Sequence, residues 1–290
     1  MAADADTPLP LRGTRLLTLA VNVPGPVAAA RLRQLGAAVV KVEPPAGDPL
    51  AIVSPGWYRE LAEGQEVLRL DLKDPSGRAR LHPLLAESDL LLTSTRPAAL
   101  ERLGLGWQPL HQHYPRLCQV AIVGHPAPHE QRAGHDLTYQ AELGLISPPQ
   151  MPRTLLADLA GAERVVSTAL ALLLARERGV TADYAQVSLV EAAAPFAEPL
   201  RHGLTAQGGA LGGGLPRYRL YHTREGWIAL AALEPHFWQR LTAALDLAEP
   251  EHEPLERVFL SRSAAEWEAW AAERDLPLVA VRGGSAVPAR

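Results

Sequence analysis

Short apolar segments alternate with helical segments along the first half of the sequence. Residues 15–21 and 38–43 have the composition of buried strands, and the alanine- and arginine-rich stretch 27–35 between them has helical spacing. A strand, a helix and a second strand in this order predict a parallel pair joined by a right-handed crossover. This pattern restricts the chain to folds that contain a parallel sheet.

The alternation continues further along the chain. Residues 67–72, 90–93 and 118–123 have the composition of strands, and residues 75–87 have that of a helix. We therefore expect an α/β fold with an open, mostly parallel sheet. Because ligands of such sheets lie beyond the carboxyl ends of the strands, we expect the functional site at that edge.

The longest helix is predicted over residues 159–178, where alanine and leucine dominate. Asp158 is a favourable N-cap for this helix, and Gly179 is a favourable residue to end it. Residues 186–190 then have the pattern of a further strand, with a helix predicted to start at Glu191.

A glycine-rich segment, residues 207–214, lacks the spacing of a phosphate-binding loop, and we interpret it as a flexible linker. Beyond it, residues 218–221 and 227–232 are typical of strands. Amphipathic helices are predicted near residues 236–247 and over residues 264–272. These elements predict a second, smaller α+β domain.

Composition and charge argue against several classes of protein. The chain of 290 residues has a net charge of −4, so no overall positive field favours nucleic acid. Its single cysteine, Cys118, excludes an intrachain disulfide and a thiolate metal cluster. The first ten residues lack the layout of a signal peptide, and the longest apolar run, residues 169–175, is too short to cross a bilayer. We expect a cytoplasmic protein that binds neither nucleic acid nor membrane.

An imidazole and a carboxylate stand out among the residues that could carry chemistry. His135 and Asp158 are separated by one short hydrophobic segment and a proline-rich loop, so a fold could bring them to the same pocket. The pair suits two reactions of a carbonyl compound, namely proton transfer beside the carbonyl and attack on it by a carboxylate. The alternatives are an ordinary N-cap aspartate and a hydrogen-bonded structural histidine.

We expect no metal site, because the other closely spaced histidines lie in loop-like segments without accompanying carboxylates. These histidines are His111, His113, His125 and His129.

Several short phrases occur in the order typical of the family III CoA-transferase superfamily (CaiB/BaiF type), which includes the α-methylacyl-CoA racemases. In sequence order the phrases are residues 24–26, 35–37, 39–43, 70–73, 96–97, 103–106, 157–158, 176–178 and 234–238. The set runs from about residue 11 to residue 278. The phrase Gly134-His135-Asp136-Leu137-Thr138-Tyr139 is similar to the racemase version, so the chain most resembles the racemase branch.

The resemblance implies a Rossmann-like large domain, which we place over residues 11–206, and a small α+β domain over residues 217–278. Residues 207–216 would link them, and residues 279–290 would form a C-terminal tail. The resemblance also implies a homodimer of interlocked chains, coenzyme A bound as an acyl-CoA substrate, and no metal or redox cofactor.

Three catalytic positions are implied by the same resemblance. Asp158 matches the aspartate that attacks the thioester in the transferases and serves as an acid/base in the racemases, and the start of its helix could stabilise the carboxylate and bind an oxyanion. His135 would serve the opposite face of the α-carbon, with Asp136 orienting its imidazole or satisfying the backbone. Glu234 matches an active-site glutamate of the small domain that could position His135.

Two basic residues, Lys41 and Arg96, match positions near the phosphates of CoA. The resemblance therefore predicts an enzyme that exchanges the α-proton of a 2-substituted acyl-CoA through an enolate. The alternatives are a CoA-transferase that moves CoA between carboxylic acids with Asp158 as nucleophile, and a degenerate, non-catalytic CoA-binding protein.

Overall fold

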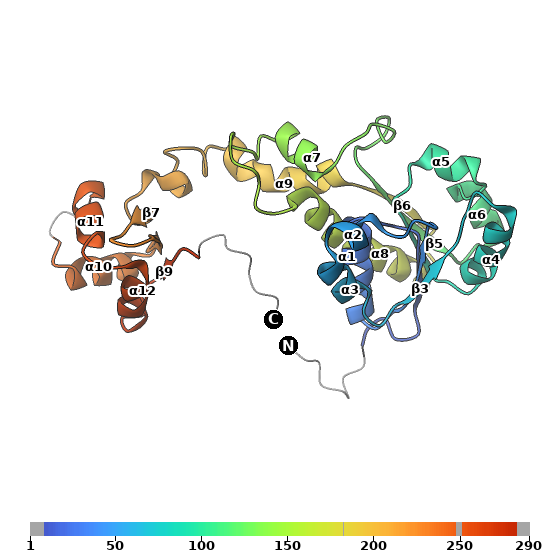
Figure 1. Cartoon of the computed structure of the whole chain (residues 1–290), viewed down its shortest axis with the longest axis horizontal. Coiled ribbons are helices and arrows are strands. Elements are labelled where there is room, and N and C mark those ends of the chain that lie inside the picture. Colours follow the sequence, from blue (N-terminus) through green and yellow to red (C-terminus); the bar gives the residue numbers. More distant parts are fainter. Residues whose placement is uncertain (1–8, 182, 248–250, 283–290) are drawn as a thin grey trace. The chain divides into compact units, whose positions relative to one another are not determined.

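The computed structural model describes residues 9–181, 183–247 and 251–282. The chain forms two compact units, Met1–Ala197 and Glu198–Arg290 (Figure 1), and each is described by itself. The domain limits expected from the sequence, at residues 206 and 217, stay predictions. Most of the expected tail, residues 283–290, lies outside the described residues.

A six-stranded parallel sheet organises the first unit, which confirms the predicted α/β fold. Its strands are β1 (Arg15–Thr18), β2 (Ala38–Glu43), β3 (Glu66–Arg69), β4 (Leu90–Thr93), β5 (Cys118–Val123) and β6 (Tyr184–Ser188). They lie in the order β3-β2-β1-β4-β5-β6, and every neighbouring pair is parallel. The chain direction of the crossovers reverses between β1 and β4, which is where doubly wound folds bind ligands.

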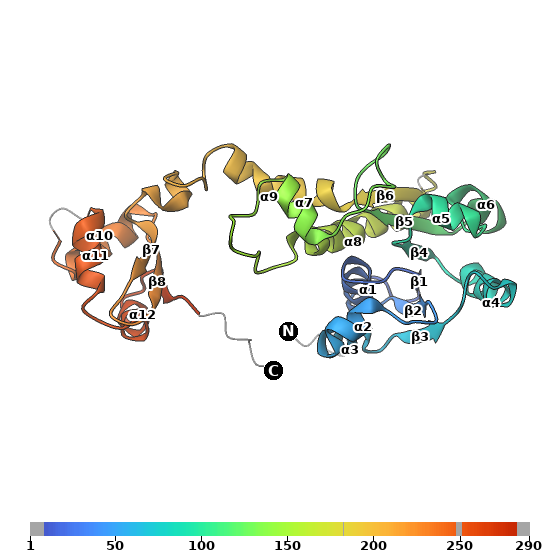
Figure 2. The ribbon, with the colours of Figure 1, turned by 45° about the horizontal axis from the view of Figure 1, so that its top comes forward.

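Helices cover both faces of this sheet (Figure 2). In chain order they are α1 (Pro24–Gln34), α2 (Pro49–Val53), α3 (Pro55–Ala62), α4 (Pro75–Ala86), α5 (Pro97–Arg102), α6 (Trp107–His113), α7 (Asp136–Glu142), α8 (Leu156–Glu177) and α9 (Leu189–Arg201). Each of the first five begins with proline, whose fixed φ and missing N–H suit the first turn of a helix. Asp48 and Asp74 cap two of them by accepting hydrogen bonds from Leu50 N and Ser76 N.

Successive residues of β1 serve two different hydrophobic cores. Leu16 belongs to a core with Leu32 of α1 and Val165 of α8. Leu17 points to the opposite face and packs with Leu81 of α4 and other leucines. Burial of the sheet centre on both faces explains why the central strands β1, β4 and β5 are mainly apolar rather than alternating.

The second unit is an antiparallel sheet with three helices, as the α+β prediction expects. Its elements are β7 (Tyr218–His222), β8 (Trp227–Ala231), α10 (Pro235–Ala244), α11 (His252–Phe259), α12 (Ala264–Ala272) and β9 (Leu278–Ala280), with strand order β7-β8-β9. Trp267 is at the centre of its core, and its indole Nε1 donates a hydrogen bond to Phe259 O at 2.8 Å. The bond satisfies the one polar atom of a side chain that is 2% exposed.

The glycine-rich segment before β7 forms a tight turn, η1 (Ala210–Gly214). A Cβ atom on Gly212 would lie 1.8 Å from the carbonyl oxygen of Ala206, and Gly213 has a φ of +86°. The glycines of this segment are therefore required by close backbone contacts and by backbone conformation. In the described part of the chain, no helix combines the length and apolar character needed to cross a bilayer.

Candidate active site

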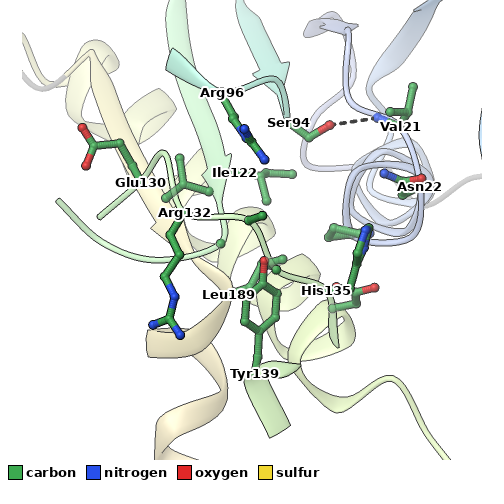
Figure 3. A pocket seen from close by; sticks show the side chains of 16 residues that line it. Val21, Asn22, Ser94, Arg96, Ile122, Glu130, Arg132, His135, Tyr139 and Leu189 are labelled. Atoms are coloured by element: carbon green, nitrogen blue, oxygen red, sulfur yellow. Dashed lines mark hydrogen bonds between the residues drawn. The ribbon is translucent and has the colours of Figure 1, made fainter. Parts of the chain in front are cut away.

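A cavity of about 270 Å³ lies at the carboxyl edge of the parallel sheet (Figure 3). Its walls come from the segments that follow β1, β4 and β5, from the start of α9, and from α7 and α8. The lining residues are Val21, Asn22, Pro24, Ser94, Arg96, Ile122, Val123, Gly124, Glu130, Arg132, Ala133, Gly134, His135, Tyr139, Asp158 and Leu189. The cavity therefore occupies the place where the strand order predicts a ligand site.

Three of the five residues predicted from the sequence line this one cavity, namely His135, Asp158 and Arg96. Lys41 does not line it. Glu234 belongs to the second unit, where it is exposed and precedes the first residue of α10. The structure thus brings the predicted imidazole and carboxylate to one cavity.

Asp158 is not the N-cap of its helix, so that prediction is wrong. Helix α8 begins at Leu156, and Asp158 occupies the third position of its first turn. The capping acceptor is Asp136 of α7, whose Oδ1 accepts hydrogen bonds from Ala157 N at 2.7 Å and Asp158 N at 3.1 Å. These two N–H groups are consequently engaged, and they do not serve as the oxyanion donors expected from the sequence.

Burial, followed by the negative charge of Asp136, raises the pKa of Asp158 from 3.8 to about 7. We expected the helix start to stabilise the carboxylate, but removal from water outweighs that effect. Within the described residues, no hydrogen bond to the carboxyl group contributes to the pKa of Asp158. A carboxyl group that titrates near neutral pH is suited to give and to take a proton.

Asp136 satisfies backbone groups, which is one of the two roles considered for it. It is 4% exposed, and its second oxygen, Oδ2, accepts a hydrogen bond from Gln140 Nε2. The same Gln140 nitrogen also donates to Thr154 O at 3.0 Å. Asp136 therefore ties the start of α8 to α7 and to the loop before α8.

The backbone of His135 is fixed by its neighbour Thr138. His135 N donates to Thr138 Oγ1 at 3.1 Å, and that hydroxyl donates to His135 O at 2.8 Å. These bonds hold the residue at the N-terminus of α7 while its side chain stays exposed at the cavity. An imidazole in this setting is available to a ligand.

Positive charge reaches the cavity from two arginines. Arg96 follows β4, and Arg132 lies on the segment after β5 and forms an ion pair with Glu142 of α7. Glu142 Oε2 also accepts a hydrogen bond from His125 Nε2 at 2.9 Å, and this bond is the first cause that lowers the pKa of Glu142. Arg132 and Glu142 were not singled out from the sequence, because only the fold brings the 132 and 142 positions together.

Lys41 lies in a buried charged cluster instead of at a ligand surface. It is 1% exposed, and its Nζ is 2.6 Å from Asp48 Oδ2 and 2.9 Å from Glu43 Oε1. This placement leaves no exposed ammonium for a phosphate, contrary to what the sequence led us to expect. The physical reason is that two buried carboxylates require a positive partner.

The cluster of Lys41, Glu43 and Asp48 nevertheless contacts a segment that lines the cavity. Asp48 Oδ1 accepts a hydrogen bond from Asn22 N at 3.0 Å. Asn22 lines the cavity with a φ of +69°, in the left-handed region that asparagine adopts more readily than most residues. On the other side of the switch point, Ser94 Oγ accepts a hydrogen bond from Val21 N at 3.1 Å.

Cys118 is fully buried in β5, and burial raises the pKa of its thiol, so it behaves as the small hydrophobic residue that we predicted. Among the described residues, no three side chains of histidine, cysteine, aspartate or glutamate are grouped so that they could hold a metal ion.

These features define a class of protein, a doubly wound α/β protein with a titratable carboxyl and an imidazole in a cavity at the switch point of its sheet. The chain belongs to CoA-transferase family III, whose sequence profile matches residues 11–287. The family resemblance noted in the sequence is therefore confirmed.

Relatives in this family differ in the reaction that they are named for. The α-methylacyl-CoA racemase of Mus musculus is 32% identical, over 89% of this chain and 74% of its own length. The succinyl-CoA–D-citramalate CoA-transferase of Chloroflexus aurantiacus is 28% identical, over 85% of this chain and 67% of its own length. Family membership alone is thus compatible with either reaction.

Solved structures agree with the fold. The crystal structure of Rv3272 from Mycobacterium tuberculosis has a TM-score of 0.82 and 27% identity, and the match covers 96% of this chain and 86% of that chain. A CAIB/BAIF family protein from Brucella suis has a TM-score of 0.79 at 20% identity, covering 96% and 85% of the two chains, which shows a shared fold.

Proposed function

We propose that the protein is an acyl-CoA enzyme that exchanges the α-proton of a 2-substituted acyl-CoA, as the racemase relatives are named for. The observation that carries this proposal is the placement of His135 and Asp158 on the wall of one cavity. The pKa of about 7 at Asp158 adds to it, because that carboxyl can hold or release a proton at working pH.

In the proposed reaction, one of the two groups takes the α-proton and the thioester becomes an enolate. The other group then delivers a proton to the opposite face of the α-carbon, which inverts that centre. After one turnover, one of His135 and Asp158 has gained a proton and the other has lost one. The reverse reaction, or proton exchange with water, returns both side chains to their starting protonation states. Arg96 and Arg132 would attract the phosphates of CoA.

Glu234 keeps its proposed role as a group that positions His135, and the support for it is the family resemblance. A Glu234→Gln variant tests this role, because it should slow exchange while the fold of the second unit persists. We keep a cytoplasmic location as a proposal from the sequence, and the family resemblance supports a homodimer of interlocked chains. Light scattering should then give twice the 31.2 kDa mass of one chain.

CoA transfer by Asp158 is the second candidate, because no described group is hydrogen-bonded to the carboxyl oxygens and they are free to attack. A carboxylate oxygen would bond to the thioester carbon, the C–S bond would break, and CoA would leave as its thiolate. This route needs an ionised carboxylate, whereas a pKa of about 7 keeps much of the group protonated at neutral pH. We therefore rank proton exchange first.

Incubation with a 2-methylacyl-CoA in deuterium oxide tests the proposal. We expect the protein to introduce deuterium at the α-carbon, as followed by mass spectrometry and proton NMR. Lack of deuterium would rule out the racemase-type reaction. In that case an acyl adduct at Asp158, trapped with hydroxylamine, would indicate the transferase, and loss of all binding to CoA esters would indicate neither.

A further inference from the structure

The side chain of Tyr139 reaches the cavity but has no part in the reaction described above. Tyr139 lies on α7, is 3% exposed, and lines the cavity with His135 and Asp158. Figure 3 shows its ring between Arg132 and His135, with the hydroxyl at the end that faces the interior of the site. Among the residues drawn there, no hydrogen bond reaches this hydroxyl.

Close neighbours hold the Tyr139 ring in this orientation. A Cβ atom on Gly124 would lie 2.3 Å from Tyr139 Oη, and one on Gly134 would lie 2.4 Å from Tyr139 Cε1. The ring also contacts His125 edge-on, with centroids 5.3 Å apart at an angle of 79°. Two glycines from different segments thus make room for one phenol, and the packing fixes the position of its ring and hydroxyl oxygen.

A donor is needed in this cavity, because a reacting thioester accumulates negative charge on its carbonyl oxygen. The N–H groups of Ala157 and Asp158 already bond to Asp136. A phenol supplies a donor with no change in its own covalent state. Burial, followed by the charge of Asp158, raises the pKa of Tyr139, so the hydroxyl keeps its proton at working pH.

We propose that Tyr139 is a further catalytic residue, whose hydroxyl donates a hydrogen bond to the thioester carbonyl oxygen of the acyl-CoA. This inference rests on the proposed function only in taking a CoA thioester as the substrate. Removal of the α-proton turns that oxygen into an enolate oxygen, and attack at the carbonyl carbon places an electron pair on it. In both reactions the proton stays on the phenol, so the hydrogen bond consumes no reactant.

The test compares the wild-type chain with Tyr139→Phe, which removes one oxygen and keeps the ring. Two ligands serve as probes, a 2-methylacyl-CoA and the matching S-alkyl-CoA thioether, in which a CH₂ group replaces the carbonyl. We expect Tyr139→Phe to lower kcat for exchange about 10²-fold and to raise KM by a much smaller factor, of about three- to tenfold. In calorimetry it should weaken thioester binding about three- to tenfold and leave thioether binding unchanged.

Tyr114→Phe is the matched control. Its hydroxyl is hydrogen-bonded to His82 Nδ1 at 2.6 Å, and Tyr114 does not line the cavity. Loss of this hydroxyl should therefore leave the binding of both probes and the exchange rate unchanged. Because a phenylalanine ring fits between Gly124 and Gly134 as tyrosine does, we expect Tyr139→Phe to fold. Circular dichroism and the melting temperature check that expectation.

Each outcome decides the role of Tyr139. If the wild type exchanges deuterium and Tyr139→Phe has the same kcat, the inference fails and the proposed function stands. If the wild type binds the thioester without exchange, but Tyr139→Phe loses only thioester affinity, proton exchange fails and the hydrogen bond stands. If Tyr139→Phe weakens the binding of both probes equally, the cavity has changed shape and the inference is overturned. If the wild type binds neither probe, both the inference and the proposed function are overturned.

Discussion

The carboxylate of Asp136 accepts a hydrogen bond from the backbone N–H of Asp158 at 3.1 Å, so one aspartate of the cavity region holds the other in place. The two residues come from different helices, α7 and α8. This contact has two effects on Asp158. It fixes the first turn of the helix that carries the residue, and it places a negative charge beside a half-buried carboxyl, which helps to raise the pKa.

Substitution of Asp136 should separate these two effects. In Asp136→Asn the amide oxygen can still accept the backbone bonds, but the charge is gone, so the pKa of Asp158 should fall while burial keeps it above 3.8. The limb of the exchange pH profile that reports Asp158 should therefore move to lower pH. Asp136→Ala also removes the cap and should cost about 1 kcal/mol or more in the free energy of unfolding.

Denaturant titration and pH-dependent exchange rates check these expectations. Asp74→Ala is the control for capping, because Asp74 caps α4 and does not line the cavity. It should lower stability without moving the pH profile. A pH profile that is identical in wild type and Asp136→Asn would contradict the electrostatic coupling.

Asp158→Asn should remove exchange activity and raise stability at neutral pH. The folded-state pKa of about 7 exceeds the ordinary value of 3.8, so the folded state holds a proton that the unfolded state releases. The wild type therefore loses stability as the pH rises from about 4 to about 7, by up to roughly 4 kcal/mol. The amide does not titrate, so the variant should lack this loss, and exchange should fall by about 10² to 10⁴.

Unfolding free energies measured at several pH values test this prediction. The difference between Asp158→Asn and wild type should grow up to about pH 7 and stay constant above it. Asp74 gives a control of opposite sign, because its hydrogen bonds with Ser76 lower its pKa. A difference that does not vary with pH would show that Asp158 has an ordinary pKa.

The central strands of the large unit were predictable because strands buried on both faces are mainly apolar whatever their neighbours are. The first strand nevertheless ends at Thr18, earlier than predicted, because the chain must turn at Asn22 before Pro24 starts α1. The order of the strands was not predictable, since it depends on contacts between segments far apart in sequence. The short helices α2 and α3 were also missed, although Asp48 before Pro49 is a recognisable start signal.

In the site, too, features set by neighbouring residues could be predicted from the sequence, whereas features set by contacts between distant segments could not. The local sequence around Asp158 is that of a good N-cap, and only the approach of α7 gives that role to Asp136. For Lys41 a signal was present, because Lys41 and Glu43 are two residues apart in a strand and so share a face. Tyr139 carried no local sign of function, and the glycines that admit it lie 5 and 15 residues earlier in the chain.

Lys41→Met should destabilise the protein strongly, because it leaves the carboxylates of Glu43 and Asp48 buried without their cation. We expect a loss of about 3–5 kcal/mol. Burial raises the pKa of Glu43, but hydrogen bonds from Tyr58 and Lys41 outweigh it, and the pKa is lowered overall from 4.5. This part of the stability is present above pH 4.5 and is lost as the pH falls through the folded-state value.

The other lysine of the chain, Lys73, is exposed and provides the control. Lys73→Met should change the free energy of unfolding by less than about 0.5 kcal/mol. Chemical denaturation at pH 7 and pH 4 measures both effects. Equal stability of the two methionine variants would show that the buried ion pairs do not hold this region.

Gly134→Ala should impair the site through Tyr139. The added Cβ would lie 2.4 Å from the Tyr139 ring, so the ring must move and its hydroxyl leaves its position. We expect a loss of about 1–3 kcal/mol in stability and a fall in exchange. Gly56→Ala is the matched control, because nothing lies within 4 Å of a Cβ at that position, and it should leave both quantities unchanged.

A second substitution shows whether Tyr139 transmits the effect of Gly134→Ala. Adding Tyr139→Leu shortens the side chain that clashes, so the double variant should regain stability relative to Gly134→Ala alone. It lacks the hydroxyl, so its exchange rate should stay low. Recovery of exchange together with stability would mean that the phenol itself is dispensable and that Gly134 acts by shaping the cavity.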